Sequence, residues 1–134
     1  MRPANEGLVA NSLIQLGHCL VQSGKPGEAE PILRECLTIR QKLQPAKWST
    51  FNAQSLLGES LLGQKKFTEA EPLLVAGYEG MKKQEAEIPP DGRVRLPQAI
   101  ERLVSYYEAT GKKDKADEWR KKLPAGNSET PSAK

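Results

Sequence analysis

Apolar side chains recur every three or four residues along most of this chain, which is the spacing of one face of an α-helix. Short segments rich in glycine and proline, such as 23–27 and 88–92, separate the periodic segments, and a proline at position 45 ends another. The pattern predicts helices over residues 3 or 4 to 22, 28–43, 51–63, 69–87, 96 or 97 to 110, and 115–123. Because the connections are short, we expect an all-α fold of three antiparallel helix hairpins.

The same triplet lies near the start of the second and fourth predicted helices. Ala-Glu-Pro at residues 29–31 returns at 70–72, forty-one residues later, and a weaker third copy places Ala116 forty-six residues after Ala70. A repeat of this length indicates an α-solenoid, in which each hairpin stacks on the next. Such repetition favours a scaffold that displays a surface over a reaction centre.

Three helix starts share one register. Gly27, Thr68 and Asp114 occupy equivalent positions, and an acid follows each of them after three residues. This is the arrangement of a capping box, in which two side chains satisfy free N–H groups of the first helical turn. It predicts that Thr68 and Asp114 are N-caps, and either Ser49 or Thr50 should cap the third helix.

Two glycines, Gly17 and Gly58, lie in the middle of predicted helices. Glycine there costs about 0.5 to 1 kcal/mol relative to alanine, so a close approach of the two helices of a hairpin must offset it. We expect small residues on the facing side, namely Ala29, Ala70 and Ala116. The register also predicts that these side chains are buried: Leu16, Ala29, Leu57 and Ala70.

The composition fits a soluble protein with one domain. A chain of 134 residues, 37% hydrophobic and 28% charged, can form one core. No segment approaches the roughly 18 apolar residues of a membrane span, and the start lacks the apolar segment of a secretory signal, which predicts a cytoplasmic location. We expect a helical domain over 4–123 and a disordered tail over 124–134, because the last residues are small, polar and include proline.

The net charge of +3 is unevenly placed along the chain. Residues 1–110 hold thirteen basic and thirteen acidic side chains, whereas residues 111–123 hold six basic and three acidic ones. A charged last hairpin suits the exposed end of a helical array. The alternative, binding of an anionic partner such as a nucleic acid, is weaker because aromatic residues are not interleaved with the bases.

Candidate chemistry is sparse. His18 is the only histidine, and no nucleophile motif or orienting carboxylate is recognisable beside it. Cys19 and Cys36 are expected to be free buried thiols, with a disulfide between them as the alternative. Trp48 and Trp119 should anchor packing. The chain lacks a zinc ligand set, a phosphate-binding loop and the motifs of protein kinases, which predicts a non-enzymatic protein without a cofactor or a metal.

The Leu-Gly pairs at 16–17 and 57–58, the apolar residues Leu20 and Leu61 after them, and then Ala29 and Ala70, resemble the tetratricopeptide repeat. The long period, with Glu-Ala-Glu-Pro opening the second helix, is similar to the repeats of kinesin light chains. The segment 33–123 also resembles the C-terminal repeat regions of bacterial serine/threonine kinases. The resemblance implies stacked antiparallel helix pairs in a right-handed superhelix.

The same resemblance implies that the first helices of the hairpins line a concave groove, which binds a peptide or a partner's helix. Register places these residues there: Asn11, Ile14, Gln15, His18, Asn52, Ser55, Glu59, Leu62, Glu101, Arg102 and Ser105. The lysine and asparagine set with which chaperone-binding members clamp a C-terminal carboxylate is absent. The alternative function is structural: the chain ends a longer array, and attachment of that array to such a kinase is one form of this alternative. The first helix, whose apolar residues have no preceding repeat, is then expected to self-associate.

Overall fold

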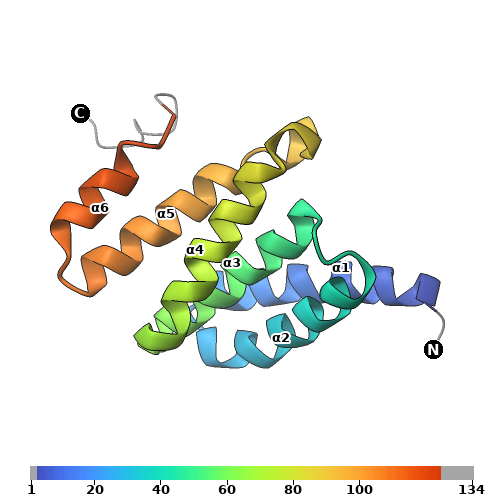
Figure 1. Cartoon of the computed structure of the whole chain (residues 1–134). Coiled ribbons are helices and arrows are strands. Elements are labelled where there is room, and N and C mark those ends of the chain that lie inside the picture. Colours follow the sequence, from blue (N-terminus) through green and yellow to red (C-terminus); the bar gives the residue numbers. More distant parts are fainter. Residues whose placement is uncertain (1–2, 125–134) are drawn as a thin grey trace.

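The computed structural model describes residues 3–124 as six α-helices and two short 3₁₀ turns, without strands in that range (Figure 1). The elements are α1 (Pro3–Gln22), α2 (Pro26–Leu43), α3 (Trp48–Gly63), α4 (Phe67–Lys83), η1 (Glu85–Glu87), η2 (Pro90–Gly92), α5 (Arg95–Ala109) and α6 (Lys113–Arg120). The predicted all-α class is therefore confirmed. The predicted tail lies outside the described residues, apart from its first residue.

Each helix packs against the next, which forms three hairpins, α1 with α2, α3 with α4, and α5 with α6. The first helices of the hairpins also contact one another, α1 with α3 and α3 with α5. The α1–α2 hairpin and α6 lie at opposite ends of the array, with α3 and α4 between them (Figure 1). This is the stacking of an α-solenoid.

Two clusters of buried side chains hold the hairpins together. The larger one runs through all three hairpins and consists mainly of leucine and alanine. The smaller one surrounds Met81 and Ile88, where Trp48 packs from α3. Trp119 packs on Tyr78 with ring centroids 5.0 Å apart and planes at 85°. Both tryptophans therefore anchor packing, as the sequence predicted.

The close approach at the two mid-helix glycines is confirmed, but larger side chains face them than the alanines we expected. A Cβ atom on Gly17 would lie 2.4 Å from Leu33, and one on Gly58 would lie 2.8 Å from Leu74. Both leucines are fully buried. Each glycine thus makes room for a leucine of the second helix in its own hairpin, which offsets its cost in helix propensity.

The predicted capping boxes are wrong. The helices α2, α4 and α6 begin one residue before Gly27, Thr68 and Asp114, so these three residues lie inside the helices, and no side chain caps the observed helix starts. The reason is the tight turn before each helix, whose central residue has a positive φ: 79° at Gly24, 65° at Lys65 and 77° at Gly111. The next N–H then bonds back to a carbonyl of the preceding helix: Lys25 to Leu20, Lys66 to Leu61 and Lys112 to Tyr107.

Other helix ends differ from the prediction by a few residues. Helix α3 begins at Trp48, so Ser49 and Thr50 lie inside it, and the Thr50 hydroxyl instead donates to the Gln44 carbonyl at 2.6 Å. Helix α4 ends at Lys83, where the chain turns into the first 3₁₀ turn. Helix α6 ends at Arg120, three residues earlier than predicted.

The prediction that Leu16 is buried is wrong. Leu16 is 47% exposed, whereas its counterpart Leu57 in the next repeat is 1% exposed. Cys19 is also exposed, while its counterpart Ser60 is buried. The difference follows from the places of the two helices in the array. The face of α3 that carries Leu57 and Ser60 packs against the α1–α2 hairpin, whereas nothing among residues 3–124 covers the equivalent face of α1.

Candidate functional site

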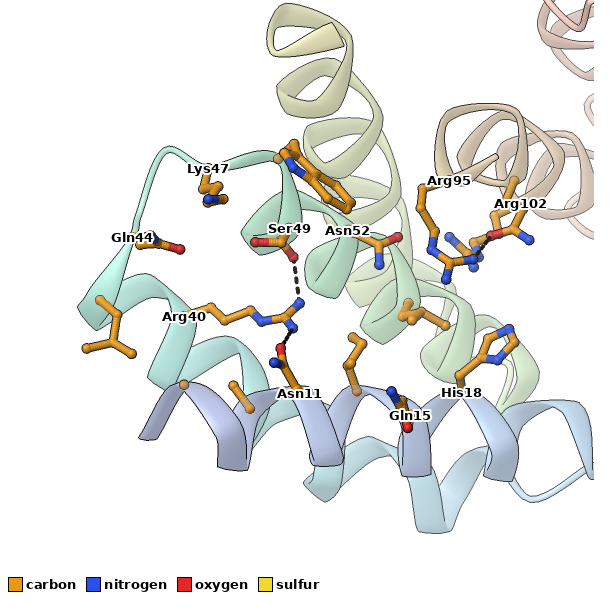
Figure 2. A pocket seen from close by; sticks show the side chains of 17 residues that line it. Asn11, Gln15, His18, Arg40, Gln44, Lys47, Ser49, Asn52, Arg95 and Arg102 are labelled. Carbon is orange, nitrogen blue, oxygen red and sulfur yellow. Dashed lines mark hydrogen bonds between the residues drawn. The ribbon is translucent and has the colours of Figure 1, made fainter. Parts of the chain in front are cut away.

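The first helices of the hairpins enclose two adjoining cavities on one side of the array, which we call the concave side. The first has a volume of about 480 Å³ and lies between α1, the end of α2, and the first turns of α3 and α5 (Figure 2). The second, of about 410 Å³, lies between α1, α3 and α5. His18, Gln98 and Arg102 line both cavities, so together they form one continuous depression.

The structure brings ten of the eleven predicted groove residues together in these cavity walls. The first cavity is lined by Asn11, Ile14, Gln15, His18, Asn52 and Arg102, and the second by His18, Glu59, Leu62, Glu101, Arg102 and Ser105. They come from α1, α3 and α5, as the register implied. The placement on one side is observed, and their use by a partner remains a prediction.

Ser55 is the predicted groove residue that the structure places elsewhere. It is fully buried, because Gly77 of α4 packs so closely on it that a Cβ atom there would lie 2.8 Å from the Ser55 backbone nitrogen. Its hydroxyl accepts a 2.9 Å hydrogen bond from Arg102. Ser55 therefore supports the concave side from beneath and cannot contact a partner.

Arg102 ties the second hairpin to the third at the floor of the concave side. Its Nε donates to the Glu59 carboxylate at 2.7 Å and its Nη1 to Ser55, and its side chain is 7% exposed. A guanidinium this deeply buried needs such partners. Arg102 and Glu59 are thus mainly structural, although both face the cavities.

Arg40 is a wall residue of the first cavity that the sequence analysis missed. From the end of α2 it donates to the Ser49 carbonyl at 3.0 Å and to the Asn11 side-chain oxygen at 2.9 Å (Figure 2). It thereby fixes the end of α2 to the first turn of α3 and to α1. The register considered only the first helices of the hairpins, so it could not find a residue on a second helix.

The first cavity has further wall residues that the sequence analysis missed. Lys47 and Trp48 come from the start of α3, and Arg95 and Gln98 from the first turn of α5. Arg95 donates to the Gln98 side chain at 3.3 Å and lies across the cavity from Arg40 (Figure 2). The basic character of Lys47 and Arg95 was visible in the sequence. Both residues precede the predicted starts of their helices, so the repeat register did not place them in the groove.

Asn52 is a polar wall residue with an unsatisfied group. Its side chain is 5% exposed, and its amide oxygen has no hydrogen-bond partner among the described residues. Buried polar atoms are usually paired, so this oxygen is an exception; because it is itself inaccessible, it lies inside the wall and offers no acceptor to a group that enters the cavity.

Metal ions in proteins are held by clusters of histidine, cysteine and acidic side chains. His, Cys, Asp and Glu side chains do not gather in groups of three or more within residues 3–124. Both cysteines are free; the Cys36 thiol is buried and donates to the Ala10 carbonyl at 3.4 Å, and burial raises its pKa. The prediction of a buried Cys19 is wrong, as noted above. Among the described helices, none has the length and apolar character needed to cross a bilayer.

Three of the six basic residues in the segment 111–123 contact aromatic rings or acids. Lys115 lies over the Tyr107 ring and Lys122 over the Trp119 ring, each 5.4 Å from the ring centroid. Arg120 pairs with both Glu108 and Asp117. This surface mixes charges of both signs, and it stays the weaker candidate for an anionic partner.

Comparisons with known proteins agree with this architecture. The family model described as "Tetratricopeptide repeat" matches residues 8–83. No curated protein matches the chain's sequence. Among solved structures, the TPR domain of Arabidopsis FLU is similar, with a TM-score of 0.70, 19% sequence identity, and coverage of 87% of this chain and 92% of that one. That likeness concerns the fold. The resemblance to kinase-associated repeats finds no support in these comparisons.

Proposed function

This chain belongs to the tetratricopeptide repeat family, and we propose that it is a non-enzymatic protein-interaction module that binds a peptide or a partner's helix on its concave side. The observation that carries the proposal is the convergence of α1, α3 and α5 on two adjoining cavities. A cytoplasmic location and attachment of the array to a serine/threonine kinase stay predictions from the sequence alone.

The surface of the concave side supports this proposal. Its walls alternate apolar side chains such as Ile14 and Leu62 with polar ones such as Gln15, His18 and Ser105. Binding sites for peptides combine apolar contact area with a few polar groups that fix the orientation of the ligand. A rigid scaffold that is already formed also lowers the entropic cost of binding.

A selection from a library of random twelve-residue peptides, displayed on phage, tests the proposal. Peptides that bind the immobilised chain should lose their affinity when the concave side is changed by Gln15→Ala, His18→Ala and Glu101→Ala together. These three side chains line the cavities and take part in no hydrogen bond that the structure records. Glu59 is left intact, because its loss would strand the buried Arg102.

The matched control changes three exposed residues of the second helices, Glu35→Ala, Thr38→Ala and Glu79→Ala. Circular dichroism should show equal helix content in both triple variants. If selected peptides bind the concave variant as well as the control, the concave side is not the binding site.

A second candidate function rests on the outer face of α1, which we define as Leu8, Leu16 and Cys19. Leu8 is 68% exposed and Leu16 is 47% exposed, whereas α3 buries the counterparts of Leu16 and Cys19 against its neighbours. The face therefore has the chemistry of a surface between hairpins. We propose that a second copy of the chain, or a preceding hairpin of a longer array, covers it.

Sedimentation velocity tests the form of this candidate that involves a second copy. Wild type should associate as its concentration rises, and Leu8→Gln with Leu16→Gln should stay monomeric. A control on another surface is Val94→Gln, which removes a residue of similar exposure. A wild type that remains monomeric at high concentration would exclude self-association through α1.

A further inference from the structure

The first cavity of the concave side has a marked charge. Arg40, Lys47, Arg95 and Arg102 line it, whereas no aspartate or glutamate of the described chain does. The sequence up to residue 110 holds equal numbers of bases and acids, so this separation arises only from folding. The cavity concentrates positive charge in a part of the chain that is neutral on average.

These cations are largely uncompensated. Arg40 donates to the Ser49 carbonyl and the Asn11 amide, and Arg95 to the Gln98 amide, so both bind neutral acceptors. Lys47 forms no ion pair within residues 3–124. Of the four cations, Arg102 alone has a carboxylate partner in the described part of the chain, namely Glu59. Two guanidinium groups and an ammonium group thus face one hollow without a counter-charge.

The apolar part of the wall limits what can enter. Ile14, Leu43 and Leu56 line the same cavity, and Asn52 adds a polar side chain to its wall. A ligand that matches this wall carries carboxylates for the arginines, an apolar side chain for the leucines and isoleucine, and an amide backbone for Asn52. A peptide combines all three, whereas a nucleic acid carries no aliphatic side chain to fill the apolar part of the wall and would find only Trp48 there for base stacking.

We propose that the ligand of the concave side is an acidic peptide, bound with at least two of its aspartate or glutamate side chains over the first cavity, between Arg40 and Arg95. The inference rests on the proposed function and specifies its ligand class. The second cavity is lined by Glu59, which pairs with Arg102, and by Glu101, which is unpaired among the described residues, so the charge changes sign along the concave side. The change of sign orients the bound peptide: its acidic part lies toward the start of α3, and its other end lies toward Ser105.

The composition of the peptides selected above gives the first test. Selected peptides should contain aspartate and glutamate more often than the input library does. If the selected peptides need the concave side but are not acidic, the charge inference fails and the proposed function stands. If the selection yields only peptides that ignore the concave side, or yields none, both fail.

Fluorescence anisotropy gives the second test, with each selected peptide compared with a version in which Asn and Gln replace Asp and Glu. The acidic version should bind about tenfold more tightly or better, and Lys47→Gln with Arg95→Gln should weaken it by a similar factor. Those two side chains support no backbone contact in the structure. The control, Lys83→Gln with Lys113→Gln, removes two exposed charges elsewhere and should change affinity less than twofold.

Two results would overturn the inference. Equal weakening by both double variants would show that net charge alone attracts the peptide. Equal affinity for a twelve-nucleotide oligothymidine, lost in the same Lys47 and Arg95 variant, would show that the cavity is a general anion site. Circular dichroism melts of the variants establish that a loss of affinity is not a loss of fold.

Discussion

The hydroxyl of Tyr107 donates a 2.7 Å hydrogen bond to the carboxylate of Glu71, which joins the third hairpin to the second. One repeat earlier, Glu30 occupies the same register and accepts a 2.9 Å bond from the Gln64 side chain at the end of α3. The glutamate of the repeated Ala-Glu-Pro triplet therefore receives a donor from the hairpin that follows. Its role is to connect repeats.

The bond between Tyr107 and Glu71 should contribute measurably to stability. Tyr107 is 3% exposed, and burial together with Glu71 raises the pKa of its hydroxyl, which keeps it a donor. Since hydrogen bonds to charged groups contribute about 1.5 to 3 kcal/mol, Tyr107→Phe should lower the free energy of unfolding by roughly that amount. Urea denaturation measures it.

A double-mutant cycle that combines Tyr107→Phe with a substitution of Glu71 isolates the pair. With Glu71→Ala in place of Glu71→Gln, which would keep an acceptor oxygen, the two substitutions should be non-additive by about 1 kcal/mol or more, because each then removes the same interaction. Additive effects would mean that the contact carries no energy of its own. Tyr78→Phe serves as the control, because the Tyr78 hydroxyl takes part in no hydrogen bond that the structure records.

The repeated glutamates show what the sequence could and could not predict. Their equal spacing revealed the repeat and the solenoid, because a helical array needs the same packing positions in every hairpin. Their partners could not be found in this way. Gln64 and Tyr107 lie more than thirty residues away, and the local capping rule proposed a nearer partner that the tight turns exclude.

The concave side shows the same division. Positions on α1, α3 and α5 follow from the repeat register, and ten of eleven line the cavities. Arg40 and Arg95 do not follow from it, because one lies on a second helix and the other at the first residue of α5. The count of charges along the sequence placed the excess of basic residues in the last hairpin. Folding instead brings unpaired cations from separate segments together at the first cavity.

Gly77 permits the closest backbone approach inside the second hairpin. A Cβ atom there would lie 2.8 Å from the Ser55 nitrogen and 2.9 Å from the Phe51 carbonyl oxygen, and backbone atoms cannot move aside as a side chain can. We expect Gly77→Ala to destabilise the protein by about 2 to 3 kcal/mol, despite alanine's better helix propensity. The control is Gly7→Ala in α1, where no atom lies within 4 Å, and it should stabilise by about 0.5 to 1 kcal/mol. Thermal melts of both variants measure these changes. If the melting temperatures of the two variants shift in the same direction, the packing argument is wrong.

Lys65 holds a backbone conformation that the other two repeats assign to glycine. Its φ is 65°, and Gly24 and Gly111 occupy the equivalent turns with φ of 79° and 77°. A non-glycine residue in the left-handed region costs about 1 kcal/mol, so Lys65→Gly should raise stability by about 0.5 to 1 kcal/mol, and Gly111→Ala should lower it. Equilibrium unfolding in urea provides both values. If Lys65→Gly is destabilising, the turn is not strained and the lysine side chain makes a contribution of its own.

Glu30 should make the stability of the fold depend on pH in the acid range. Hydrogen bonding from Gln64, followed by Arg34 and Lys66, lowers the pKa of this carboxyl from about 4.5 to about 2.

Because the pKa is lower in the folded state, the stabilisation is complete above pH about 4.5 and is lost as the pH falls toward 2. Glu30→Gln should therefore cost about 1 to 2 kcal/mol at pH 7, a range that allows for the exposure of both cations to solvent. The difference from wild type should shrink steadily between pH 4.5 and pH 2. Glu35→Gln, an exposed position on the same helix, controls for general charge effects. If the difference in the free energy of unfolding between wild type and Glu30→Gln stays constant down to pH 3, Glu30 is not the group whose protonation changes the stability of the fold.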